Sequence, residues 1–132
     1  MPTVFTRIIN GDLPGRFVYT DEVAVAFLSI APVTPGHVLV VPRVEVDQWT
    51  DLPDDVLQHL MAVAKKVGEA AKEAFGAPRA GLLIAGLEVP HMHVHVFPMW
   101  SMQDFDIGGA KAATAADLDE AAAKLKAALG SA

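Results

Sequence analysis

The chain has 132 residues, of which 52% are hydrophobic and 20% are charged, so its length and composition suit one folded domain with a sizeable core and exclude a disordered protein. The formal net charge of −6 argues against a general nucleic-acid-binding surface, so a phosphate-bearing substrate would need positive charge concentrated locally. The chain contains no cysteine, which excludes disulfides, thiolate metal ligands and a thiol nucleophile, and its apolar runs are too short to span a membrane.

The first half of the chain is a series of short apolar segments separated by turn residues. Helical spacing of apolar residues, followed by three strand-like runs, predicts a short helix and three strands over residues 4–9, 16–20, 23–28 and 37–41. The first two strand-like runs flank Asp21 and Glu22, so we expect them to form a β-hairpin.

The longest helical pattern begins at Pro53 and ends at Gly76, where glycine and the nearby proline stop a helix. His59 falls inside this pattern and is interpreted as a surface or packing residue. Beyond it, the pattern predicts two strands and a C-terminal helix over residues 80–85, 87–98 and 114–129. The order helix, three strands, helix, two strands, helix, with short connections, favours antiparallel pairing in an α+β fold.

Three of the five histidines, His91, His93 and His95, alternate along the predicted strand of residues 87–98. Alternate residues of a strand share one face, so we expect the imidazoles to form a row with the intervening apolar residues buried behind it. Pro98 cannot donate to a strand ladder and is expected to end the strand. The row is compatible with a solvated strand face, with a metal site that uses a His-x-His ligand pair, or with catalysis by imidazoles that titrate near neutral pH.

The triad with its apolar spacers, H-φ-H-φ-H-φ-φ with φ apolar, resembles the signature of the HIT (histidine triad) superfamily of nucleotide hydrolases and transferases. Residues 27–42 are similar to that family's second signature, and residues 4–11 resemble its usual start. The resemblance implies one HIT domain over residues 1–132, with a five-stranded antiparallel sheet and packed helices in an α+β fold. It also implies a homodimer.

The resemblance further implies hydrolysis at the α-phosphate of a small nucleotide, either a phosphoramidate or a dinucleoside polyphosphate. The middle histidine, His93, would attack the phosphorus and form a nucleotidyl-histidine that water then hydrolyses. His91 and His37 would orient the surroundings of the nucleophile, and His95 would contact the phosphate or help protonate the leaving group. Histidine and not glutamine at the last triad position favours hydrolysis over nucleotidyl transfer. No metal or other cofactor is implied, because imidazolium and backbone N–H groups can stabilise the transferring charge.

The residues that match the family's nucleotide-binding positions are Phe5, Ile8, Phe27, Ser29 and Ile30. From the sequence alone, the four apolar ones are first interpreted as ordinary core residues. Ser29 stands where the family usually has Asp or Asn to hold ribose hydroxyls, and it cannot accept two hydrogen bonds in the same bidentate way. The segment before the triad looks shortened at Ala85–Glu88, with Leu87 or a gap where the family usually has a Gln that contacts phosphate. Glu88 stands where the family tends to have Ser or Thr, and a carboxylate there would repel phosphate.

Three functions therefore stay open. The first is a HIT-type nucleotide hydrolase. The second is a metal-dependent enzyme with the three histidines as ligands, although three histidines on one strand do not converge easily. The third is a nucleotide-binding or partner-binding protein with weak catalysis, which Ser29 and Leu87 would suit.

The expected partners are a small-molecule nucleotide and a second copy of the chain, with no nucleic acid and no membrane. The N-terminal sequence shows no basic region followed by an apolar core, and the chain has no cysteine. Both features lead us to expect a cytoplasmic protein.

Overall fold

The structure is a computed structural model that describes residues 2–130. Its helices and strands are α1 (Val4–Ile9), β1 (Phe17–Thr20), β2 (Ala24–Leu28), β3 (Val38–Pro42), α2 (Asp54–Phe75), β4 (Arg79–Leu83), β5 (Val94–Met99) and α3 (Ala115–Gly130). Three short 3₁₀ helices, η1 to η3, span Trp49–Asp51, Met102–Asp104 and Ile107–Gly109. The strands form one sheet in the order β1-β2-β3-β5-β4, with every neighbouring pair antiparallel. The predicted α+β fold, its five-stranded antiparallel sheet and the order of its elements are confirmed.

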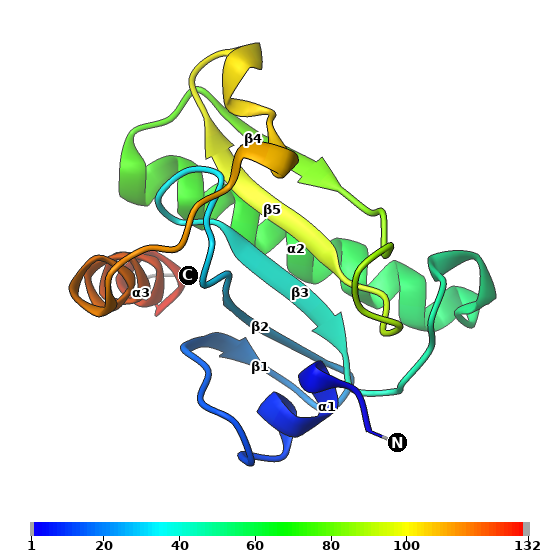
Figure 1. The fold of residues 1–132 in the computed structure, drawn as a ribbon. Helices are drawn as coiled ribbons and strands as arrows, with labels where there is room; N and C mark the ends of the chain where they lie inside the picture. Colours follow the sequence, from blue (N-terminus) through cyan, green and yellow to red (C-terminus); the bar gives the residue numbers. More distant parts are fainter. Residues whose placement is uncertain (1, 131–132) are drawn as a thin grey trace.

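The long helix α2 covers one face of the sheet (Figure 1). The even-numbered valines of β3 and β5, which are Val38, Val40, Val94 and Val96, are buried in the core cluster on this face. Met92 joins them just before β5 begins. Burying each such side chain contributes about 1.5–3 kcal/mol, so the alternation along β5 is held by strong apolar packing. The odd-numbered residues of β5 are thereby placed on the opposite face.

A second, smaller core lies on that opposite face beneath α1. Phe5 of α1 packs edge-on against Phe27 of β2, with ring centroids 5.6 Å apart. Val25 of β2 and Leu39 and Val41 of β3 complete the buried cluster. The central strands are therefore buried on both faces, which explains why β2 and β3 are continuous apolar runs in the sequence. This packing also fixes α1 against the face of the sheet that is opposite α2. We call it the odd-numbered face, because the odd-numbered residues of β3 and β5 lie on it.

Polar contacts at the ends of the elements explain where several of them start and stop. The Thr3 hydroxyl accepts the Thr6 N–H at the start of α1, and the Thr114 hydroxyl accepts the Asp117 N–H at the start of α3. Gly76, at φ 63°, ends α2 in the left-handed conformation. His59 of α2 contacts an Asp21 carboxylate oxygen at 2.7 Å and so ties α2 to the β1–β2 turn, in line with its predicted packing role. Among residues 2–130, no helix combines the length and the apolar character that crossing a membrane would need.

The strand observed in the region predicted as residues 87–98 is shorter than predicted, and it begins and ends nearer to the C-terminus. Strand β5 begins at Val94 and ends at Met99, so Pro98 lies inside it and the prediction that Pro98 ends the strand was wrong. Pairing with β3 stops at Val96, while Pro98 still pairs with Ala80 of β4. The Pro98 carbonyl accepts the Thr34 hydroxyl at 2.7 Å and so points away from β4. Because N–H and C=O of a strand residue point to the same side, the missing N–H of Pro98 faces no strand partner.

Two connecting segments frame the odd-numbered face near the C-terminal end of β2. The β2–β3 loop folds back on itself, because Ser29 N–H donates to the His37 carbonyl and His37 N–H donates to the Thr34 carbonyl. The segment after β5 crosses the sheet on the same side on its way to α3 (Figure 1). Ala113 N–H, which donates to the Ile30 carbonyl, fastens this segment to the loop.

We expect Gly36→Ala to lower the free energy of unfolding by about 1–3 kcal/mol, because alanine would be strained at positive φ and its methyl group would clash with the Phe75 ring. Gly36 has φ 95°, and a Cβ there would lie 2.5 Å from the Phe75 ring. Gly11→Ala is the matched control, since Gly11 has φ 84° but open space around a Cβ. Urea unfolding of both variants measures the difference. Equal losses would mean that contact with Phe75 does not restrict this position.

Candidate active site

Three histidine rings meet on the odd-numbered face of the sheet. His93 immediately precedes β5, His95 lies within it, and His37 immediately precedes β3. The rings of His93 and His95 have centroids 4.8 Å apart, and those of His37 and His95 are 5.1 Å apart. The register that pairs Leu39 with His95 explains this proximity, because it places the start of β3 beside β5. Sequence positions far apart are thus joined in one imidazole cluster.

A chain of hydrogen bonds fixes the proton positions on two of these rings. The Val33 backbone N–H donates to His37 Nδ1 at 3.0 Å, so His37 carries its own proton on Nε2. His37 Nε2 lies 2.9 Å from His95 Nδ1 and must be the donor in that contact. His95 Nδ1 is therefore an acceptor, and neutral His95 carries its proton on Nε2.

A separate hydrogen bond orients His93. Its Nδ1 lies 2.9 Å from the His91 carbonyl oxygen, which can only accept, so the proton of neutral His93 is on Nδ1. His93 Nε2 is left with a free lone pair. The Phe5 ring packs edge-on against the His93 ring, with centroids 4.8 Å apart, and limits how the imidazole can tilt. His93 consequently has the proton distribution of a nitrogen nucleophile.

Burial keeps these imidazoles neutral at pH 7. Burial, with a smaller effect of charge on His95 and His93, lowers the pKa of His37 to about 3. Burial and charge on His93 lower the pKa of His95 to about 4. Burial also lowers the pKa of His93, although its hydrogen bond to the His91 carbonyl opposes the shift. The cluster therefore offers lone pairs and N–H donors, and not fixed positive charge.

His91 does not join the predicted row of three imidazoles. It precedes β5 and its side chain is completely buried. His91 Nε2 lies 2.8 Å from the Pro42 carbonyl, and His91 Nδ1 lies 2.8 Å from the Thr3 hydroxyl. The ring therefore braces the start of α1 against the end of β3. Its backbone carbonyl, and not its ring, contacts the imidazole of His93.

The sequence analysis did not identify the polar residues that support His91. The Glu45 carboxylate accepts the Thr3 N–H and the Thr6 hydroxyl, both at 2.7 Å, and these bonds lower the pKa of Glu45. Thr3 in turn contacts the His91 ring. The capping Thr at the start of α1 was a visible sequence signal for a helix terminus, but no local pattern links it to Glu45 or His91.

A cavity of about 360 Å³ lies over His93 and His95. Its described lining residues are Ser29, Ala31, His37, Leu83, Ala85, Gly86, Leu87, Glu88, His93, His95, Ile107, Gly108 and Ala110. The wall thus combines the β2–β3 loop, the β4–β5 connection and the segment after β5. Leu87 and Glu88, which depart from the family pattern, both line it.

The five residues predicted to bind the nucleotide lie in different environments in the structure. Phe5 and Phe27 are buried in the second core, where half-buried Ile8 packs against them. Ile30 is 73% exposed and lies apart from that cluster. Ser29 lines the cavity, and its hydroxyl accepts the Ala31 N–H at 3.3 Å. Of the five, Ser29 alone is among the described residues that line the cavity over His93.

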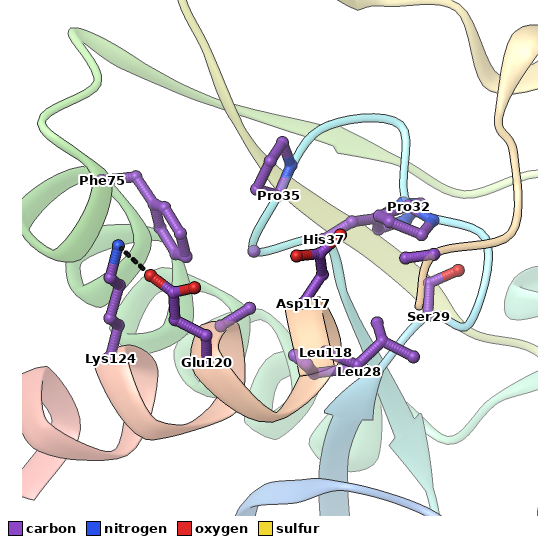
Figure 2. A pocket seen from close by; sticks show the side chains of 13 residues that line it. Leu28, Ser29, Pro32, Pro35, His37, Phe75, Asp117, Leu118, Glu120 and Lys124 are labelled. Carbon is purple, nitrogen blue, oxygen red and sulfur yellow. Dashed lines mark ion pairs between the residues drawn. The ribbon is translucent and has the colours of Figure 1, made fainter. Parts of the chain in front are cut away.

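A second cavity of about 400 Å³ flanks the first on the side of α3 (Figure 2). Phe75, Pro35 and Leu118 contribute to its mostly apolar wall, and Lys124 pairs with Glu120 at its edge, 3.3 Å apart. Ser29 and His37 line both cavities, so they separate this space from the cavity over His93 and His95. The second cavity contains no triad residue among the described residues that line it.

The described part of the chain contains no group of three His, Cys, Asp or Glu side chains placed to hold a metal ion. The reason within the triad is geometric, because His91 turns toward Thr3 and Pro42 while His93 and His95 face the cavity. The three rings therefore do not converge on one point, as the ligands of a tetrahedral zinc site must.

Comparisons with known proteins agree with this architecture. A family model for the HIT domain matches residues 10–102. The chain is 38% identical over 109 residues to an uncharacterized HIT-like protein of Saccharolobus solfataricus, with 79% of this chain and 78% of that protein covered. It is 31% identical over 96 residues to adenosine 5′-monophosphoramidase of Saccharomyces cerevisiae, with 72% and 61% covered. The crystal structure of a zinc-bound histidine triad family protein from Mycobacterium smegmatis matches with a TM-score of 0.86 at 30% identity, covering 97% and 93%.

The lowered histidine pKa values predict a loss of stability in acid. Between pH of about 6.5 and 4, histidines of the unfolded chain bind protons that His37 and His95 in the folded chain do not. The free energy of unfolding therefore falls as the pH falls, by up to about 1.4 kcal/mol per pH unit for His37 alone. We expect His37→Gln to have a shallower slope in urea unfolding measured from pH 7 to pH 4. An unchanged slope would show that His37 binds its proton as readily in the folded chain as in the unfolded chain.

Proposed function

The chain belongs to the HIT domain family, and we propose that it is a nucleotide hydrolase that forms a covalent nucleotidyl-histidine on His93. The observation that carries the proposal is the proton arrangement of the cluster: a free lone pair on His93 Nε2 beside a His95 whose N–H is on Nε2. The similarity to a yeast adenosine 5′-monophosphoramidase supports a nucleoside phosphoramidate as the substrate.

In the first step, His93 Nε2 attacks the α-phosphorus, an N–P bond forms, and the bond to the leaving group breaks. The ring keeps its Nδ1 proton and becomes a cation in the intermediate. The His91 carbonyl, which accepts that N–H at 2.9 Å, stabilises the positive charge. A positively charged imidazole is a good leaving group, which prepares the second step.

We assign His95 to hydrogen bonding and not to proton transfer. Its Nδ1 is occupied by the donor His37, and His37 cannot pass a proton on because its Nδ1 accepts the Val33 N–H. Loss of the Nε2 proton would leave an imidazolate, so His95 Nε2–H acts by donating to a phosphoryl oxygen. The proton that a leaving amine requires comes from solvent.

In the second step, water attacks the phosphorus, His93 Nε2 departs with its electron pair, and one water proton is released to solvent. The products are the amine and the nucleoside monophosphate, so the two displacements add up to hydrolysis. We place the nucleoside toward Ser29, with Phe27 and Phe5 behind it. We place the leaving group along the Ala85–Glu88 segment, which lines the same cavity as His93 and Ser29.

We also propose that the chain forms a homodimer through β4 and α2. β4 is an edge strand, and its Leu82 is 41% exposed. A groove between β4 and α2 is lined by Met61, which is 39% exposed, and by Gly68. An exposed apolar edge strand invites pairing with a second copy of the same edge.

We expect His93→Ala to lower kcat for adenosine 5′-phosphoramidate by about 10³-fold or more, because the nucleophile is lost. Mass spectrometry of acid-quenched wild-type protein should find an AMP adduct on the peptide that contains His93, and the variant should have none. His59→Ala is the control, since His59 lies on α2 outside the cavity. Retention of most of kcat by His93→Ala would remove His93 from the nucleophile's role.

The same assay separates the competing functions. Dialysis against a chelator should leave turnover unchanged, whereas recovery only on adding zinc would identify a metal-dependent enzyme. AMP binding by calorimetry without turnover of any phosphoramidate or dinucleoside polyphosphate would identify a binding protein.

Sedimentation analysis tests the proposed dimer. Wild-type protein should sediment as a dimer, and Leu82→Glu should shift it to monomer by burying an unpaired charge at the edge-to-edge contact. Leu87→Glu makes the same change at a residue that is 95% exposed and lies outside the groove, so it should stay dimeric. A wild-type monomer, or a Leu82→Glu dimer, would exclude this interface.

A further inference from the structure

The cavity over His93 and His95 carries an unusual charge for a site that binds phosphate. Of its thirteen described lining residues, Glu88 alone is Asp, Glu, Lys or Arg. Its three histidines are neutral at pH 7, because burial lowers their pKa values. The cavity wall therefore holds one negative charge and no fixed positive charge.

Glu88 is placed to act on the reacting centre. It lies on the β4–β5 connection, five residues before His93, with its side chain exposed at the cavity wall. Its charge opposes the lowering of the pKa of His93, so the carboxylate is within electrostatic range of that ring. No described Lys or Arg ion pair involves Glu88, so its charge is not neutralised within the protein.

Such a wall disfavours some substrates of HIT-type chemistry and favours others. A dinucleoside polyphosphate brings several negative charges, and the described cavity wall supplies no cation to compensate them. A phosphoramidate brings its negative charge only at the scissile phosphorus, where the His95 Nε2–H is available as a donor. An ammonium group on the departing amine would add an attraction to the carboxylate.

We propose that Glu88 is a specificity-determining residue that selects nucleoside phosphoramidates whose leaving amine carries a second, positively charged group. The class includes phosphoramidates of diamines and of amino acids with basic side chains. The inference rests on the proposed function, because it assumes that the cavity over His93 holds the scissile phosphorus. It places the leaving group along the Ala85–Glu88 segment and the nucleoside at Ser29, both of which line this cavity.

The expected preference is modest and depends on salt. An ammonium–carboxylate pair at a solvent-exposed wall is weakened by water and by counterions. We therefore expect a three- to tenfold effect on kcat/KM at low ionic strength, falling toward unity at about 1 M salt.

The test compares three adenosine phosphoramidates of matched length whose amines are ethylenediamine, propylamine and β-alanine. Their distal groups are respectively cationic, neutral and anionic. Wild-type kcat/KM should decrease in that order at low salt, and the order should collapse at high salt. Diadenosine tetraphosphate should be slower than the propylamine compound.

Variants of Glu88 assign the preference to its carboxylate. Glu88→Gln should remove the order, and Glu88→Lys should reverse it. Each readout is a ratio of substrates on one protein, so a partly inactive preparation does not affect it. Glu22→Gln removes one negative charge from an exposed residue of the β1–β2 turn and should keep the wild-type order.

Each result bears on a different claim. Equal rates with all three phosphoramidates, or an unchanged order in Glu88→Gln, would overturn the role of Glu88 and leave the proposed hydrolase intact. No turnover of any phosphoramidate by wild-type protein would overturn the proposed function itself.

Discussion

The site depends on the alternation of side chains along β5. Met92, Val94 and Val96 are buried against α2, and this packing leaves the intervening residues no choice of face. A shift of one residue in the pairing register of β5 would place His93 and His95 in the apolar core and expose Val94 and Val96. The apolar packing behind the strand is thus what aims the imidazoles at the cavity, and it explains why His93 and His95 lie at or within a central strand.

The second constraint is that the proton position of each imidazole is set by a backbone group, either directly or through a neighbouring ring. Val33 N–H sets the proton position of His37, and through it that of His95, while the His91 carbonyl sets that of His93. Backbone groups suit this role because their donor or acceptor character does not change with pH. Burial then keeps the rings neutral, at the expense of stability in acid. The same burial that keeps these rings neutral therefore makes the folded chain sensitive to protonation.

The sequence predicted features that depend on local periodicity. The spacing of apolar residues located α2, and the alternation in the triad predicted which side of β5 is buried. The sequence analysis wrongly ended the strand at Pro98, because the position where β3 stops pairing with β5 is a property of strand register and not of local sequence. It also placed the His91 ring in the row, since nothing near His91 signals that Thr3 and the Pro42 carbonyl will bind it. Contacts between residues more than 40 positions apart, such as Thr3 with Glu45, leave no periodic trace.

The division between strands and loops suggests which parts of the site are free to change. His95 lies in the sheet, and His37 and His93 lie one residue from it, where a shift of backbone would disturb both cores. Ser29, Leu87 and Glu88 all lie on connections, where a substitution changes the cavity wall without altering the packing behind it. Departures from the family pattern at these positions therefore change the cavity wall and leave the imidazole cluster in place. A single carboxylate on such a connection is enough to change the charge of the whole wall, because the buried histidines contribute none at neutral pH.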